Sequence, residues 1–159
     1  MQSDPGPGNF LNRIIMKSYK DLNEKEKQQL LKYPAYISLL ASTAEGSMDE
    51  QEKKTAVKLT HVKTFSSDPL LSGFYKEAEG VFETTLNALN SELPVRKEDR
   101  MVAISEELEK LESLLKKLDP EYASVLRRSM ASYKQHISRA HRNVLEYFIF
   151  PVPIDGLSD

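Results

Sequence analysis

The chain contains no cysteine among its 159 residues. This absence excludes disulfides, thiol nucleophiles and sites in which cysteine holds zinc or an iron–sulfur cluster, and it leaves the redox environment open. The sequence also lacks a glycine-rich phosphate loop, a Gly-x-Ser-x-Gly nucleophile elbow and the residue order of a catalytic triad. No catalytic motif therefore assigns a reaction to the chain.

Long apolar runs are missing as well. No stretch approaches the roughly 20 apolar residues that a membrane-spanning helix needs. Residues 1–8 do not show the basic-then-apolar pattern of a signal peptide, so we expect a cytoplasmic protein without a membrane span. The formal net charge of −2 creates no strong field for nucleic acid or an anionic membrane, and we expect neither as a partner.

The remaining composition is that of an ordinary globular domain, with 40% hydrophobic and 29% charged residues. No segment alternates convincingly between apolar and polar residues, which is the pattern of a half-buried strand. The sequence therefore predicts an all-α fold, a compact bundle of about six or seven helices. We expect an N-terminal tail or arm over residues 1–22 and a single helical domain over residues 23–159.

Capping signals mark where the helices begin. Asn23 with Glu26, and Asp49 with Glu52, each form the pattern of a capping box, and Pro34 is suited to a first helical turn. The pairs Asp68-Pro69 and Asp119-Pro120 combine a cap with such a proline. The expected helices start near residues 23, 34 and 49, and then cover about 69–92, 97–118 and 120–148. For the third helix we expect the inner face to contain Ala56, Leu59 and Val62.

The turn between the second and third helices is unusually acidic. Four carboxylates, those of Glu45, Asp49, Glu50 and Glu52, fall within eight residues with no lysine or arginine among them. Hard cations such as Ca²⁺ and Mg²⁺ prefer oxygen ligands at this density. We therefore single out Glu45, Asp49 and Glu52 as candidate metal ligands, with Gly46 shaping the turn. Helix capping and the helix dipole explain the same acidic residues without any metal.

A complete calcium-binding EF-hand loop is not expected at this turn. With Gly46 at position 6 of the loop, Asp49 and Glu52 take positions 9 and 12, as the motif requires. Positions 1 and 3 are then Ala41 and Thr43, which supply no carboxylate and lie within an apolar helix. Any cation site here would be of another type.

The segment from Pro34 to Glu52 consists of an apolar helix ending in Ala44, a turn at Gly46, an apolar residue, an acidic cap and a glutamate three residues later. This pattern resembles the core of the TerB-like (tellurite-resistance) family, and Gly46, Met48, Asp49 and Glu52 match it as they stand. Glu45 replaces the aspartate that the family usually has. Residues 137–159 resemble a weaker second copy, but the chain ends at Asp159. The resemblance implies a compact helical bundle linked to stress response, signalling or metal sensing, generally without demonstrated catalysis.

The sixth expected helix is strongly basic on one side. Between residues 127 and 142 the chain has five arginines or lysines and no acid. Such a face can bind phosphate or an acidic partner, can simply be solvated, or can pair with the glutamates of the fifth helix at residues 106, 107, 109 and 112. The candidate contacts are Arg127, Lys134, Arg139, His141 and Arg142.

Three functions remain open from the sequence. The first is a non-catalytic binding module with a Ca²⁺ or Mg²⁺ site at residues 45–52 and a protein partner. The second is a Mg²⁺-dependent enzyme acting on a phosphate-bearing ligand, with Arg139 and Arg142 as anion contacts. The third is a structural adaptor without a ligand.

Two other features of the sequence bear on function. The apolar stretch 147–154 either seals the core or docks a partner. The three histidines lack the spacing of a zinc site.

Overall fold

The computed structural model describes residues 17–44, 50–66 and 68–149, and within these ranges every regular element is a helix. This result confirms the expected all-α class for the described part of the chain. The elements are η1 (Tyr19–Asp21), α2 (Glu24–Leu31), α3 (Tyr33–Thr43), α4 (Glu50–Ser66), η2 (Pro69–Leu71), α5 (Ser72–Glu92), α6 (Lys97–Leu115) and α7 (Pro120–Ile149). No helix in these ranges is both long and apolar enough to cross a membrane.

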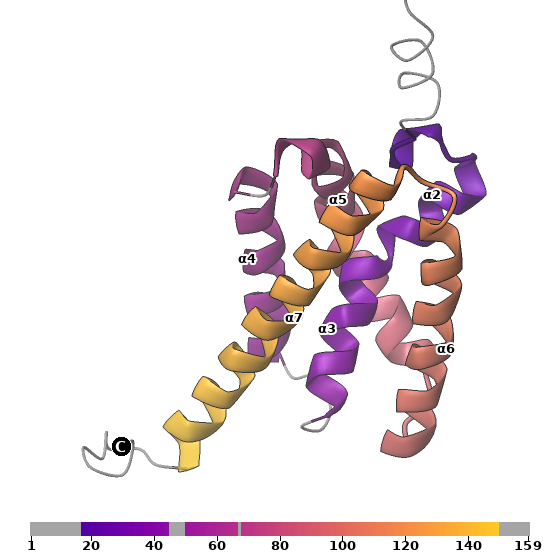
Figure 1. Ribbon diagram of the computed structural model, residues 1–159. Coiled ribbons are helices and arrows are strands. Elements are labelled where there is room, and N and C mark those ends of the chain that lie inside the picture. Colours follow the sequence, from indigo (N-terminus) through magenta and orange to yellow (C-terminus); the bar gives the residue numbers. More distant parts are fainter. Residues whose placement is uncertain (1–16, 45–49, 67, 150–159) are drawn as a thin grey trace, which may run out of the picture.

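Helix α3 lies at the centre of the bundle (Figure 1). It packs against α5, α6 and α7, and each of its residues except Leu40 is buried. Its sequence is apolar or small around its whole circumference, which is typical of a helix surrounded by protein. Burial on all sides therefore follows from its composition.

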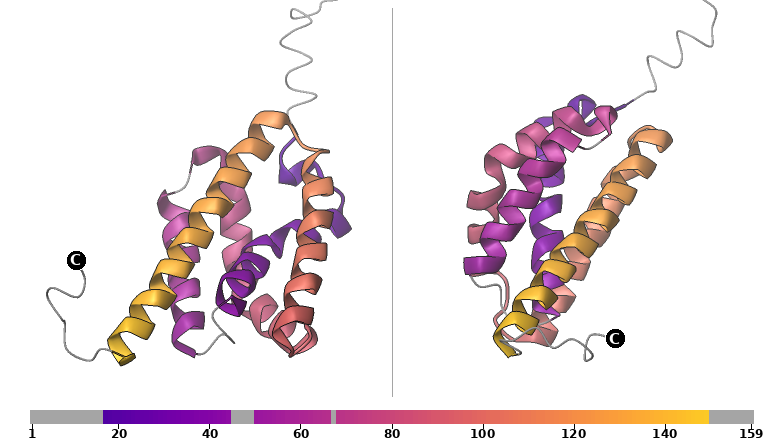
Figure 2. Two further views of the ribbon diagram at one scale, coloured as in Figure 1. Left: turned by 60° about the horizontal axis from the view of Figure 1, so that its bottom comes forward. Right: turned by 90° about the vertical axis from the view of Figure 1, so that its left-hand side faces the viewer.

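Helix α7 crosses one side of the bundle obliquely and contacts both α3 and α4, as the two views of Figure 2 show. Helix α4 in turn packs between α5 and α7. The N-terminal end of the described chain also joins the core, because Tyr19 and Leu22 are buried and the Tyr19 ring packs edge-on against Phe74. The C-terminal end of α3 and the N-terminal end of α4, which flank the acidic turn in the sequence, lie at one end of this arrangement.

The predicted helix starts agree well with the structure. The Asn23 side chain accepts a hydrogen bond from the Glu26 amide at 2.8 Å, and the Glu26 carboxylate accepts one from the Asn23 amide at 3.2 Å. Asp119 likewise accepts hydrogen bonds from the first amides of α7. Asp68 also acts as a cap, but the turn that follows it is the 3₁₀ helix η2, and α5 begins three residues later than expected.

The buried residues of the two longest helices recur mainly at three- and four-residue steps, which is the pattern of an amphipathic helix. The buried residues of η2 and α5 are Leu71, Phe74, Tyr75, Ala78, Phe82, Leu86 and Leu89. Those of α7 include Tyr122, Leu126, Met130, Tyr133 and Ile137. The prediction for Val62 was wrong, since this residue is 52% exposed. The inner face of α4 is formed by Glu52, Ala56 and Thr60. Val62 follows Thr60 by two residues, or about 200° of helix rotation, and therefore points away from the core.

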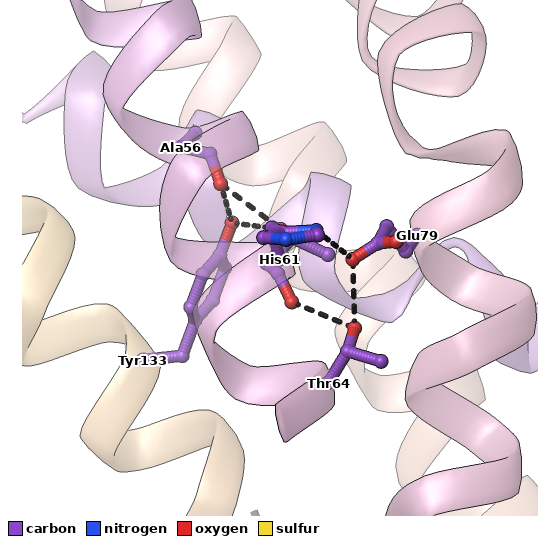
Figure 3. Close-up of polar contacts among 6 residues, drawn as sticks. Ala56, His61, Thr64, Glu79 and Tyr133 are labelled. Atoms are coloured by element: carbon purple, nitrogen blue, oxygen red, sulfur yellow. Dashed lines mark hydrogen bonds and ion pairs between the residues drawn. The ribbon is translucent and has the colours of Figure 1, made fainter. Parts of the chain in front are cut away.

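A buried hydroxyl group joins three helices in the core. The Tyr133 hydroxyl of α7 lies 3.1 Å from the Ser38 hydroxyl of α3 and 3.0 Å from the Thr60 hydroxyl of α4. It also donates to the Ala56 carbonyl at 3.2 Å, and Figure 3 shows Tyr133 beneath this carbonyl. Burial raises the pKa of the Tyr133 phenol to about 12, so the group stays neutral and keeps its proton to donate.

Replacing Tyr133 by phenylalanine should lower the free energy of unfolding by about 1–3 kcal/mol, because the Ser38 hydroxyl would remain buried without this partner. Urea denaturation followed by circular dichroism measures the change. A double-mutant cycle with Ser38→Ala isolates the contribution of the hydrogen bond. If Ser38→Ala destabilises the wild type and the Tyr133→Phe variant equally, the two hydroxyls are not coupled and this account of the core is wrong.

Candidate functional site

The acidic turn connects the end of α3 to the start of α4. Three of its candidate residues, Glu45, Gly46 and Asp49, lie outside the described residues. The described residues that border the turn are Ala44, which follows the last residue of α3, and Glu50 and Glu52 in the first turn of α4. What the structure shows of this site therefore comes from the surroundings of these three residues.

The two described glutamates occupy opposite environments. Glu52 is only 5% exposed and lies one helical turn before buried Ala56, so its carboxylate faces inward. The side chain of Glu50 is 79% exposed, and its carboxylate accepts a hydrogen bond from the Lys53 ammonium at 2.9 Å. Of the two, only Glu52 therefore has the burial expected of a functional carboxylate.

The fold also brings a lysine to this turn from a distant part of the sequence. The Lys97 ammonium, at the start of α6, donates a hydrogen bond to the Ala44 carbonyl at 3.0 Å. A cation next to the C-terminal end of α3 is favoured by the helix dipole. Residues 45–52 contain no basic residue, yet the folded turn has a positive charge beside its first residue.

A buried arginine, Arg100, stabilises the connection between α5 and α6. Lys97 is the first residue of α6 after this connection. The Arg100 guanidinium is 7% exposed and donates to the Pro94 carbonyl at 2.9 Å and the Leu93 carbonyl at 3.4 Å. It also contacts the backbone and side-chain oxygens of Asn90. These contacts satisfy carbonyls that the end of α5 leaves without helical partners. Sequence reasoning missed Arg100, because an arginine in a first helical turn normally indicates an exposed position.

On its other side, α4 is tied to α5 at the protein surface. The His61 ring Nδ1 lies 2.9 Å from the Glu79 carboxylate, which also accepts a hydrogen bond from the Thr64 hydroxyl at 2.9 Å (Figure 3). His61 therefore serves as a contact between helices in this structure. Within the described ranges, no group of three His, Cys, Asp or Glu side chains is placed to hold a metal ion.

A groove of about 590 Å³ runs between the N-terminal half of α4 and α5. Lysines 54 and 58 line one wall, Glu83 and Asn87 line the other, and Val57 contributes an apolar surface. Among the described residues, the lining of the groove includes Glu50 but no residue of α7. The described part of the groove therefore gives no support to the enzyme hypothesis, which requires the acidic turn and the basic residues of α7 to share one cleft.

The basic candidates on α7 differ in their surroundings. Arg127 pairs with Glu112 of α6, with a shortest nitrogen–oxygen distance of 2.6 Å, so at this position the structure shows the third of the three alternatives that the sequence left open. Lys134 and Arg139 are exposed. Side chains from residue 140 onward are not described, so His141 and Arg142 stay predictions. Arg128, which was not among the candidate contacts, is also exposed.

No protein-family model matches the chain, and no curated protein and no solved structure is significantly similar to it. The resemblance to the TerB-like family therefore rests on the sequence pattern of residues 34–52 and, more weakly, on that of residues 137–159.

The different environments of Glu50 and Glu52 lead to a matched pair of variants. Glu52→Ala should lower the free energy of unfolding by about 1–3 kcal/mol, because it removes a side chain that fills a buried position. Glu50→Ala should change it by less than about 1 kcal/mol, since an exposed ion pair contributes little. Thermal and urea denaturation of both variants provide the measurement. Equal effects would mean that Glu52 is not part of the buried face of α4.

Proposed function

We propose that this chain is a non-catalytic helical binding module of the TerB-like type, whose acidic turn at residues 45–52 binds Ca²⁺ or Mg²⁺. The observation that carries the proposal is the burial of Glu52 at the start of α4. Glu52 belongs to the inner face of α4 together with Ala56 and Thr60, and a carboxylate in such a position is one of the oxygen ligands that hard cations prefer. Glu45 and Asp49 would be the further oxygen ligands of a divalent cation at this turn.

Some of the described residues near the turn favour cation binding, and others oppose it or take no part in it. Glu52 faces inward as a ligand should, whereas exposed Glu50 is engaged by Lys53 and is not included. Lys97 places a competing positive charge beside the turn. A cation bound here would act against this charge, so we expect modest affinity, in the micromolar to millimolar range of weak calcium sites.

The proposal that the module is non-catalytic is supported by the structural contacts that the buried polar side chains make. The Tyr133 hydroxyl joins α3, α4 and α7, and the Arg100 guanidinium closes the connection between α5 and α6. Both groups make contacts that fix helices in place, which is suited to a scaffold that presents surfaces. The cytoplasmic location and the link to stress response or tellurite resistance belong to the same proposal and rest on the sequence.

Titration with Ca²⁺ or Mg²⁺ should release or absorb heat in calorimetry and should raise the melting temperature, because a ligand that binds only the folded state stabilises it by mass action. At a concentration 100 times the Kd, the gain is about 2.7 kcal/mol. Glu45→Gln should reduce both signals, and combining it with Glu52→Gln should abolish them. Glu50→Gln is the matched control and should leave them unchanged.

A second variant tests the competing charge. Lys97→Gln should strengthen cation binding by a few-fold, because it removes a like charge close to the bound ion. The absence of heat and of any melting shift at millimolar metal, in both the wild type and Lys97→Gln, would show that the acidic residues serve only as helix caps.

A further inference from the structure

The outward surface of α7 carries charge of one sign. Arg128 and Arg139 are exposed on the side opposite the buried residues that include Leu126 and Tyr133, and exposed Lys134 lies on the flank of the helix next to Arg127. We call these three residues the α7 basic face. Glu121 occupies the first turn of the helix, but the 18 residues from 122 to 139 contain no carboxylate. Helices on a protein surface usually mix both signs, so five turns without an acidic residue, with basic residues over more than three of them, need an explanation.

The fold itself does not use these three cations in ion pairs. Among the described residues, the ion pairs involve Lys53, His61, Arg96, Lys110, Lys117 and Arg127. None of them includes Arg128, Lys134 or Arg139. Arg127 provides the contrast, because it lies on the side of α7 toward α6 and pairs with Glu112. The α7 basic face is thus available for a partner.

Helix geometry decides what size of partner fits. Arg128 and Arg139 are eleven positions apart, which places them about 16 Å apart along the helix and nearly in line. Lys134 lies between them in height, about 120° around the helix from Arg128. Charges spread in this way do not converge on one phosphate group. They match a partner whose negative charges are distributed over about three helical turns.

We propose that the α7 basic face docks an acidic helical segment of a protein partner. Ala131 is exposed between the two flanks of the face, and a small side chain at that place lets another helix approach closely. Carboxylates spaced by one or two turns on that helix would meet the three cations. The inference rests on the proposed binding-module function, but it does not depend on the cation site at residues 45–52.

The charge of the rest of the molecule favours a protein partner over nucleic acid or a membrane. Three exposed cations release few counterions, so binding to a nucleic-acid backbone through them would be weak. The chain as a whole has a net charge of −2, which opposes association with a large polyanion. An acidic helix carries its negative charges only where it contacts the α7 basic face. The negative charges elsewhere on the protein therefore repel it much less than they repel a large polyanion.

The experiment uses two synthetic helical peptides of about 20 residues. One carries glutamates along one face, and the other carries glutamines at the same positions. Fluorescence anisotropy with the full chain should show binding of the glutamate peptide that weakens as salt is raised, and at least about tenfold weaker binding of the glutamine peptide. Arg128→Glu combined with Arg139→Glu should weaken binding of the glutamate peptide by at least about tenfold.

The matched control is Lys25→Glu combined with Lys76→Glu, which alters exposed residues of α2 and α5 and changes the net charge equally. It should weaken binding by less than about threefold, because distant surface charges are screened. Circular dichroism confirms that both double variants fold. Equal losses in the two double variants, or no binding of the glutamate peptide by the wild type, would overturn the proposal.

Two further measurements separate this proposal from its alternatives. The full chain is also titrated with duplex DNA, RNA and anionic vesicles. If one of these binds more tightly than the peptide, and loses binding with Arg128→Glu and Arg139→Glu, the partner belongs to that class and is not a protein. Repeating the peptide titration with EDTA and with Ca²⁺ separates the two sites. Peptide binding without any calcium heat would refute only the cation site, and calcium heat without peptide binding would refute only the docking face.

Discussion

Within the described part of the chain, the hydroxyl of Tyr133 joins three helices of the core. Apolar packing tolerates many arrangements of similar volume, whereas a buried hydroxyl must meet its hydrogen-bonding partners at a defined distance and direction. Ser38 on α3 and Thr60 on α4 provide those partners. The contact therefore restricts how α3, α4 and α7 can rotate about their own axes. The positions of the remaining side chains on α4 and α7 follow from this restriction.

Fixing those rotations also separates the charges of the molecule. With Thr60 turned toward Tyr133, the same face of α4 turns Glu52 inward and leaves Glu50 in solvent. With Tyr133 turned toward α3 and α4, the opposite face of α7 presents Arg128 and Arg139 outward. Arg128 and Arg139 thus lie on the side of α7 that faces away from α3 and α4, whereas Glu52 lies on the inner face of α4. This arrangement of the described residues supports the proposal of two binding sites over that of one catalytic cleft.

Local signals in the sequence predicted the features that depend on neighbouring residues. The capping box at Asn23 and the cap at Asp119 were both predicted correctly, because each is determined within the first turn of one helix. Features that depend on distant segments were not predictable in the same way. Val62 had the apolar character of a core residue, but the contacts of α4 with α5 and α7 set its rotation. The pairing of Arg127 with Glu112 was open until the fold placed α6 beside it.

The acidic turn shows most clearly why charge density along a sequence is an incomplete guide to metal binding. Residues 45–52 contain four carboxylates and no basic residue, yet Lys97 reaches the Ala44 carbonyl from the start of α6. That lysine is held there by a connection that Arg100 closes. The electrostatic potential at the turn is therefore determined partly by residues about 50 positions away in the sequence. A cation bound at the turn, as proposed, would be held by Glu52 and its neighbours against this charge, so its affinity would depend on α6 as well as on the carboxylates of the turn.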